Sequence, residues 1–373
     1  MERRKFIQHS VLSFIALSAG ASCSSKIPQA SSYQSKKGFV YLGLLVSPEK
    51  SIIRKLDLST YEYTDTVVPI GRTHAVTNSA TSPDEIYVFD FRGSAVRVNT
   101  RSSEILAKID HTSSGQGLFH GHGIHDQEEK ILWCSEITEK QGYVIRARSA
   151  DDLSLINGKD YSFAGGHHVS RLPNTNILTS AGSLGDKKHF ISFFDFRNRE
   201  IKKTASTDYP GVHVLPISSS EVVSVSTEHI MGEGELSNFN RSANPVTRAL
   251  MSEKELHFAG TSPLLYVNLN GEVRNHWDPS RKEIFQLGLG LDRLNPGGRY
   301  VTSHYSSNSV IVWENFEVTK VLNVPNPLVV VASADGSEVA VQSDAGLRIY
   351  SLESGKQVKN IRYEYPLYTL SKY

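Results

Sequence analysis

The chain has 373 residues, with 40 Lys and Arg against 39 Asp and Glu, and a formal net charge of +1. A near-neutral chain without a basic block beyond its N-terminus is not typical of proteins that bind nucleic acid or membrane surfaces electrostatically. Only three Met occur, and runs of Val, Ile, Tyr and Phe favour strands. The composition indicates a soluble, β-rich chain.

Residues 1–23 have the order of an export signal. Arg3, Arg4 and Lys5 precede the apolar residues 11–17, and small residues follow. Such a segment directs export and is too short to span a bilayer stably. The adjacent arginines resemble a twin-arginine signal, and a general secretory signal that contains two arginines is the alternative. We therefore expect a periplasmic protein.

Cys23 ends a stretch that resembles a lipoprotein cleavage box, Gly20-Ala21-Ser22-Cys23. Lipidation of Cys23 would anchor the protein to the membrane, and simple cleavage near the same place is the alternative. Residues 24–37 are rich in Ser, Gln and Lys and predict a flexible tether. If Cys23 is lipidated or removed with the signal, the other cysteine, Cys134, has no intramolecular partner, so a disulfide framework is excluded. Cys134 lies in an apolar run. We interpret Cys134 as a small buried hydrophobe, with a metal-binding thiolate as the alternative.

Residues 38–373 predict an all-β fold. Strand-sized runs and polar turns follow one another in seven units of about 40 to 50 residues, which is the period of a β-propeller blade. A seven-bladed β-propeller of the WD40 or YVTN type is therefore the expected fold, with the N-terminal strands completing the last blade. Eight blades or a pair of β-sandwiches are the alternatives. One insertion, around 231–262, interrupts the fifth unit.

Histidines preceded by glycine recur at intervals of about 45 to 48 residues, again the period of a blade. They are His74, His122, His168 and His213. Because the innermost strand of each blade lines the central channel, we expect these four side chains to face one axis. Neutral imidazoles are suitable ligands for Cu, Fe or Zn. His125 is expected to face away from His122, since side chains alternate along a strand.

Further polar residues lie near these histidines or close later strands. The full candidate ligand set is Arg72, His74, His122, Glu136, His168, His213, Glu228 and His304. A channel for a small polar ligand is as consistent with this pattern as a metal site. Histidines that only cap turns beside closely packed glycines are the remaining alternative.

Several short motifs resemble a known family. They are Gly71-Arg72-Thr73-His74, Gly121-His122-Gly123, Ser135-Glu136, Gly165-Gly166-His167-His168, and Thr261 to Tyr266 followed by Gly271-Glu272. Their order resembles the exported propellers grouped as domain of unknown function 1513. The resemblance implies an exported propeller linked with iron-acquisition proteins, and it implies no known reaction. Where that family has a Ser-Ile-Arg-His strand, residues 287–291 read Leu-Gly-Leu-Gly-Leu, so a complete shared ligand set is not implied.

We therefore expect an exported propeller that binds a metal ion or small polar ligand in a His-lined channel. It would be accessory to metal or redox metabolism, with another envelope protein as a partner and Cys23 as its membrane contact. One alternative is a metal-dependent hydrolase or oxidoreductase with Glu136 or Glu228 as general base. Another is a protein-interaction scaffold. No phosphate-binding loop, nucleophile elbow or Cys-x-x-Cys motif indicates an enzyme.

Overall fold

The computed structural model describes residues 35–90, 93–110, 118–138, 142–156, 162–184, 188–226, 261–294, 297–343 and 346–372. These residues belong to one compact unit that begins at Ser35. The predicted export signal, Cys23, Glu228 and most of the predicted insertion lie outside the described residues.

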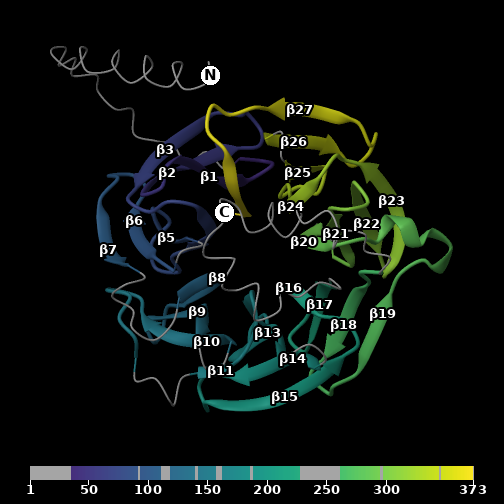
Figure 1. Cartoon of the computed structure of the whole chain (residues 1–373), viewed down its shortest axis with the longest axis horizontal. Coiled ribbons are helices and arrows are strands. Elements are labelled where there is room, and N and C mark those ends of the chain that lie inside the picture. The colour runs from purple at the N-terminus through teal and green to yellow at the C-terminus, as the bar shows by residue number, and fades with distance from the viewer. Residues whose placement is uncertain are drawn as a thin grey trace, which may run out of the picture. The chain divides into compact units, whose positions relative to one another are not determined.

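Seven four-stranded antiparallel sheets form a ring, with one strand of each sheet nearest the centre (Figure 1). The seven innermost strands are β4 (Thr73–Asn78), β8 (Leu118–Asp126), β12 (Val169–Arg171), β16 (Gly211–Pro216), β20 (Gly288–Leu294), β24 (Pro327–Ala332) and β28 (Leu367–Lys372).

The next strands outward pair with these in the same order. They are β5 (Glu85–Asp90), β9 (Ile131–Thr138), β13 (Ile177–Leu184), β17 (Glu221–Ser226), β21 (Arg299–His304), β25 (Glu338–Ser343) and β1 (Phe39–Ser47). The third strands are β6 (Ala95–Asn99), β10 (Gly142–Ser149), β14 (Lys188–Asp195), β18 (Leu264–Asn268), β22 (Ser309–Glu314), β26 (Gly346–Ser351) and β2 (Lys50–Asp57).

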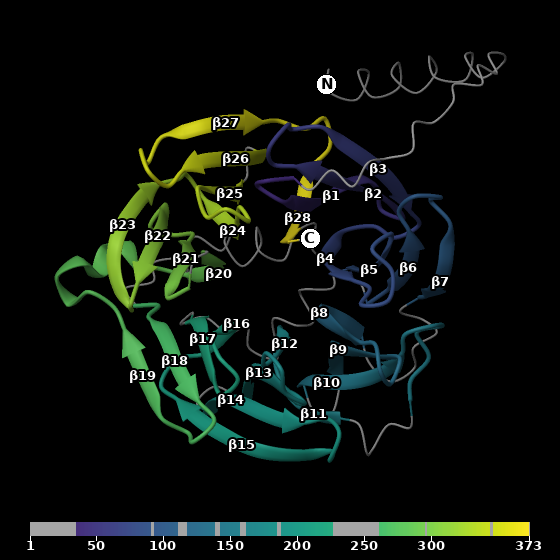
Figure 2. The same ribbon diagram turned by 180° about the vertical axis from the view of Figure 1, so that it is seen from behind.

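The outermost strands complete the sheets at the rim, as Figure 2 shows from behind. They are β7 (Ile105–Ile109), β11 (Ser162–Ala164), β15 (Glu200–Thr207), β19 (Val273–His276), β23 (Glu317–Asn323), β27 (Gln357–Ile361) and β3 (Tyr63–Val68). One short 3-10 helix, η2 (Pro279–Ile284), connects β19 to β20.

The predicted seven-bladed all-β propeller is confirmed, and the alternatives of eight blades or two sandwiches are wrong. The ring closes because β28, from the C-terminal end, pairs with β1 from the N-terminal end. The predicted insertion falls between β17 and β18. Within the described part of the chain, no helix has the length and apolar character that a membrane span requires.

The core lies between neighbouring sheets. Central strands such as β5 and β25 are buried along nearly their whole length, because both faces pack against other sheets. Rim strands are more exposed, and in β3 only two of the six residues are buried. Trp133 and Trp313 are among the largest fully buried side chains. This packing fixes the inner strands from which the site is built.

Most inner strands have a register shift near their start. The shifts lie between Thr73 and Ala75 in β4, Phe119 and Gly123 in β8, and Gly211 and His213 in β16. Strands β20, β24 and β28 have comparable shifts. An extra residue in one strand bends it and redirects its side chains. Because strands with the same place in successive blades run the same way, these bulges share one face of the ring.

Candidate functional site

Five histidines gather on four consecutive inner strands or directly before them. His74 comes from β4, His122 from β8 and His213 from β16, while His167 and His168 directly precede β12. The ring centroids of neighbouring pairs lie between 4.4 and 5.5 Å apart. The structure therefore brings together the four histidines singled out in the sequence and adds His167. We call these five residues the histidine cluster.

Glycines beside the histidines let the inner strands approach closely. A Cβ atom at Gly121 would lie 2.0 Å from the carbonyl oxygen of His167, and one at Gly166 would lie 1.5 Å from that of Ala181. Neither position can therefore accept a side chain without moving backbone. The backbone N–H of His122 donates to the His167 carbonyl over 3.4 Å, which links two adjacent blades at the cluster.

Three of the five side chains form a group with metal-ligand geometry. Ring nitrogens of His74, His122 and His167 all lie within 4.8 Å of one another. The Nε2 atoms of His74 and His167 are 3.1 Å apart. Two nitrogens that bind one tetrahedral ion at the usual Zn–N distance are separated by about 3.3 Å. The geometry therefore fits one ion held by three imidazoles, with a coordination position left open. We call these residues the triad.

His213 supports the triad through a hydrogen-bond chain. Its Nδ1–H donates to the carbonyl oxygen of Leu289, which leaves a lone pair on Nε2 in the neutral ring. That Nε2 lies 3.3 Å from Nε2 of His122. In the neutral pair His122 therefore donates from Nε2, which leaves on Nδ1 the lone pair that a metal ion would bind. A ligating histidine whose other nitrogen donates outward is the usual arrangement in metal sites.

Burial favours the neutral form of three imidazoles in the cluster. It lowers the pKa of His122 well below its usual value, and the neighbouring histidines add to this effect. Burial likewise lowers the pKa of His168 well below its usual value. For His213, burial lowers the pKa to about 4, although the hydrogen bond to Leu289 opposes the shift. A neutral imidazole is the form that binds a metal ion.

Glu136 is held in a buried ion pair. Its Oε1 accepts from Nε of Arg148 over 2.5 Å, and its Oε2 accepts from Nη1 of Arg146 over 3.4 Å. The side chains of Glu136 and Arg148 are 0% and 1% exposed. A carboxylate neutralised in this way serves the packing of β9 against β10. It is not free to act as the general base of the enzyme alternative.

His304 belongs to a separate buried chain of hydrogen bonds. Trp313 Nε1 donates to Thr302 Oγ1 over 2.9 Å, and this hydroxyl lies 2.9 Å from Nε2 of His304. The ring of His304 also packs edge-on against Phe285. Burial lowers the pKa of His304 to about 3. The structure thus places His304 among contacts that tie β21 to β22, apart from the triad.

The remaining candidates lie at various places. Arg72 is a half-buried residue in the bend before β4, next to the bulge that carries His74. Glu228 lies outside the described residues. Cys134 is a buried free cysteine whose pKa is raised well above its usual value by burial. In the part of the chain that the structure describes, no cysteine or carboxylate joins the triad as a metal-binding group.

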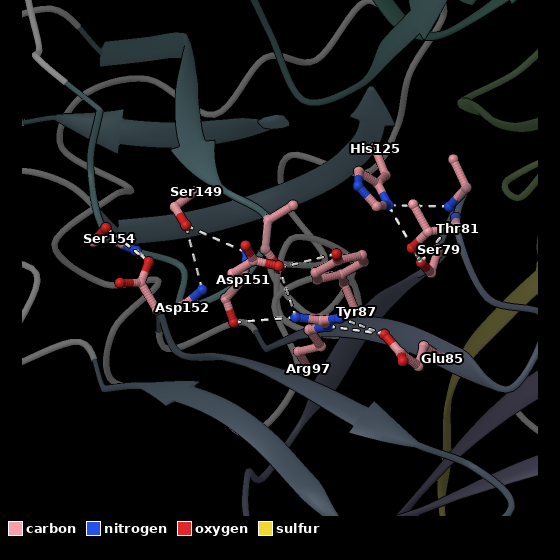
Figure 3. Close-up of polar contacts among 12 residues, drawn as sticks. Ser79, Thr81, Glu85, Tyr87, Arg97, His125, Ser149, Asp151, Asp152 and Ser154 are labelled. Carbon is pink, nitrogen blue, oxygen red and sulfur yellow. Dashed lines mark hydrogen bonds and ion pairs between the residues drawn. The ribbon is translucent and has the colours of Figure 1, made fainter. Parts of the chain in front are cut away.

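His125 faces an inter-blade polar cluster, in line with the expected alternation along β8. Its Nδ1 accepts from the backbone N–H of Ala80 over 3.0 Å and lies 3.3 Å from Ser79 Oγ. Figure 3 shows this contact near Tyr87, whose ring meets that of His125 edge-on. His125 and His122 therefore have different surroundings although they share one strand.

His167 is the site residue that sequence reasoning did not select. The motif Gly165-Gly166-His167-His168 contains both histidines, and the blade spacing selects His168. Both rings lie in the cluster, but it is His167 that joins the triad. Its only signal in the sequence is its neighbour, since blade spacing cannot separate two adjacent residues.

Comparisons with known proteins support the fold alone. No protein-family model and no curated protein matches the chain. Among solved structures, hydrazine synthase of Kuenenia stuttgartiensis is similar, with a TM-score of 0.58 and 10% identity over 91% of this chain and 100% of that one. The C-terminal WD40 domain of Sif2 is similar with a TM-score of 0.51 and 8% identity, over 78% of this chain and 73% of that one.

Proposed function

We propose that the histidine cluster binds one transition-metal ion through His74, His122 and His167. The observation that carries this proposal is the approach of three ring nitrogens, from three different blades, to within 4.8 Å of one another. Histidines serving only as turn caps need not converge in this way. The hydrogen bond from His213 to the Leu289 carbonyl adds the outer support that a metal site requires.

The ligand chemistry favours copper or zinc. Imidazole nitrogen suits both ions, and the Irving–Williams order places their affinities above that of Fe²⁺. Non-haem iron sites usually combine two histidines with a carboxylate. In the described residues no carboxylate joins the triad, and Glu136 is bound by arginines. Iron is therefore the least favoured of the three metals expected from the sequence.

A titration of the purified full chain with Cu²⁺ and Zn²⁺, followed by calorimetry, tests the proposal. We expect one ion per chain for the wild type. His122→Asn should lower the affinity at least about 100-fold, since each ligand of a zinc site contributes roughly 3 kcal/mol. His125→Asn is the matched control, because His125 lies on the same strand but outside the cluster. Absence of stoichiometric uptake, or equal affinity in His122→Asn, would contradict the proposal.

We further propose that the protein is exported and acts in the cell envelope as an accessory of metal or redox metabolism, together with another envelope protein. The twin arginines Arg3 and Arg4, the apolar residues 11–17 and Cys23 support this role. The motifs that resemble the domain of unknown function 1513 also support an exported protein.

Cell fractionation tests the export proposal. Replacing Arg3 and Arg4 together by Lys should retain the full-length chain in the cytoplasm if the twin-arginine route is used. Cys23→Ser should release the exported protein from the membrane fraction if Cys23 is lipidated. Cytoplasmic location of the wild type would overturn the proposal.

A further inference from the structure

We infer that the metal-loaded centre binds a small anion at its open coordination position, with Nε2–H of His168 as the hydrogen-bond donor to that anion. The inference rests on the proposed metal site. It names the class of ligand that this site would take, which the fold and the triad do not specify.

A divalent metal ion at the triad would carry an uncompensated positive charge. A divalent ion held by three neutral imidazoles keeps its full charge of 2+, because the triad supplies no anionic ligand. In the described residues, no Asp, Glu or Cys joins the triad, and the carboxylate of Glu136 is already neutralised by Arg148 and Arg146. The triad residues are half-buried, where an uncompensated charge is costly. An anion at the open position relieves this cost.

The hydrogen bonds of His168 determine which of its ring nitrogens carries the proton. The backbone N–H of Val214 donates to Nδ1 of His168 over 3.3 Å. Ser170 Oγ is also 3.4 Å from Nδ1, but its hydrogen is donated to the carbonyl oxygen of Val214 over 2.7 Å. Nδ1 therefore carries the lone pair, and the proton of the neutral ring is on Nε2. His168 is thus a donor at Nε2.

The ring of His168, which carries this donor, lies next to a triad residue. The ring of His168 lies 4.4 Å from that of His122, a triad residue, and 5.2 Å from that of His213. Within the described part of the chain, Nε2 of His168 has no hydrogen-bond partner, whereas Nδ1 is bonded as above. An accessible N–H next to the triad, left without a protein acceptor among the described residues, is suited to an anion or oxygen ligand on a metal ion held there.

Azide is the probe that tests this inference, because it is a small anion that binds metal ions directly. Wild type, His168→Leu and His168→Gln would be loaded with Cu²⁺ and titrated with azide, following the absorption of the copper–azide complex. His168→Leu removes the donor, and His168→Gln retains an N–H donor. We expect His168→Leu to weaken azide binding about tenfold or more, and His168→Gln to stay within about threefold of the wild type, since a hydrogen bond to a charged group is at stake.

The outcomes separate this inference from the metal proposal. If the copper-loaded wild type does not bind azide, or if His168→Leu binds it as tightly as the wild type, the inference is overturned while the metal site stands. If the wild type takes up no copper, the metal proposal itself fails. Should His168→Leu not fold, nitrogen NMR of the zinc-loaded wild type decides. The Nε2–H signal of His168 should shift on adding azide, and an unchanged signal would overturn the inference.

Discussion

Four consecutive inner strands, β4, β8, β12 and β16, carry imidazoles within them or directly before them. The three that complete the ring, β20, β24 and β28, have register shifts at the same place but carry Leu289, Leu328 and Tyr368 there. We call the first group the histidine arc and the second the opposite arc. Bulges occur in both arcs, in every one of these strands except β12, so the chemistry of the site comes from the side chains that each arc carries there.

The two arcs are not independent, because the opposite arc supports the histidine arc through its backbone. The carbonyl oxygen of Leu289, in the bulge of β20, accepts the hydrogen bond from His213. A strand without any metal-binding side chain thereby fixes which nitrogen of His213 faces His122. A propeller can therefore divide one site between the side chains of some blades and a backbone carbonyl of another.

The largest expected effect is on the free energy of unfolding. It comes from the buried ion pair of Glu136, which stabilises the fold and takes no part in the histidine arc. Glu136→Gln removes the carboxylate that pairs with the buried Arg148, which should lower the free energy of unfolding by about 3–5 kcal/mol. Metal affinity of the folded protein should stay the same, because Glu136 is not a ligand. Chemical denaturation and metal titration measure the two quantities. Glu128→Gln is the control, since that side chain is 76% exposed. A loss of metal affinity without a loss of stability would move Glu136 into the site.

The next effect, on metal affinity, tests whether His213 supports the triad from within the histidine arc. His213→Leu should reduce metal affinity about 10- to 100-fold while one ion per chain still binds, as expected for an outer-shell partner. Tyr368→Phe, in the opposite arc, should leave the affinity unchanged. Calorimetric titration measures both variants. Complete loss of binding in His213→Leu would show that His213 is itself a ligand, and an unchanged affinity would remove it from the site.

A third prediction concerns His304, a buried imidazole in β21 that serves the opposite arc structurally. Its folded pKa of about 3 lies below that of the unfolded chain. Above a pH of about 6.5 both states are neutral and His304 has no effect on stability. As the pH falls, the unfolded chain takes up the proton first, so stability falls by about 1.4 kcal/mol per pH unit until the folded pKa is reached.

Denaturation of the metal-free protein between pH 7 and pH 4 measures this dependence. In His304→Leu the slope should be smaller by the equivalent of one proton, whatever the variant's stability at pH 7. An identical slope in the wild type and His304→Leu would mean that folding does not lower the pKa of His304.

The sequence predicted the fold because the strand runs and glycine–histidine pairs repeat once per blade. It predicted the convergence of His74, His122, His168 and His213 for the same reason, since equivalent positions of a propeller meet near its axis. It could not predict which nitrogen each ring presents, because a neighbouring blade decides this. The pairing of Glu136 with Arg148 depends on the register of two strands, which the spacing of polar residues does not reveal.

The carbonyl of Leu289 was the least predictable part of the site, since a backbone acceptor leaves no side-chain signature. Residues 287–291 lack the Arg and His that the resembling family has in this strand, and β20 nevertheless contributes through its backbone. This contribution leads to the smallest expected effect. Leu289→Ala keeps the carbonyl, so metal affinity should stay within about threefold of the wild type.

The free energy of unfolding distinguishes Leu289→Ala from a control variant at a buried leucine. Leu289 is half-buried, so Leu289→Ala should cost about 1 kcal/mol of unfolding free energy, below the 2–5 kcal/mol typical of buried leucines. Leu328→Ala, at a buried leucine of β24, should cost more and also leave the metal affinity unchanged. If Leu289→Ala instead weakens metal binding as much as His213→Leu, the leucine side chain positions His213. The opposite arc would then act on the site through packing, and the division between side chains and backbone would be wrong.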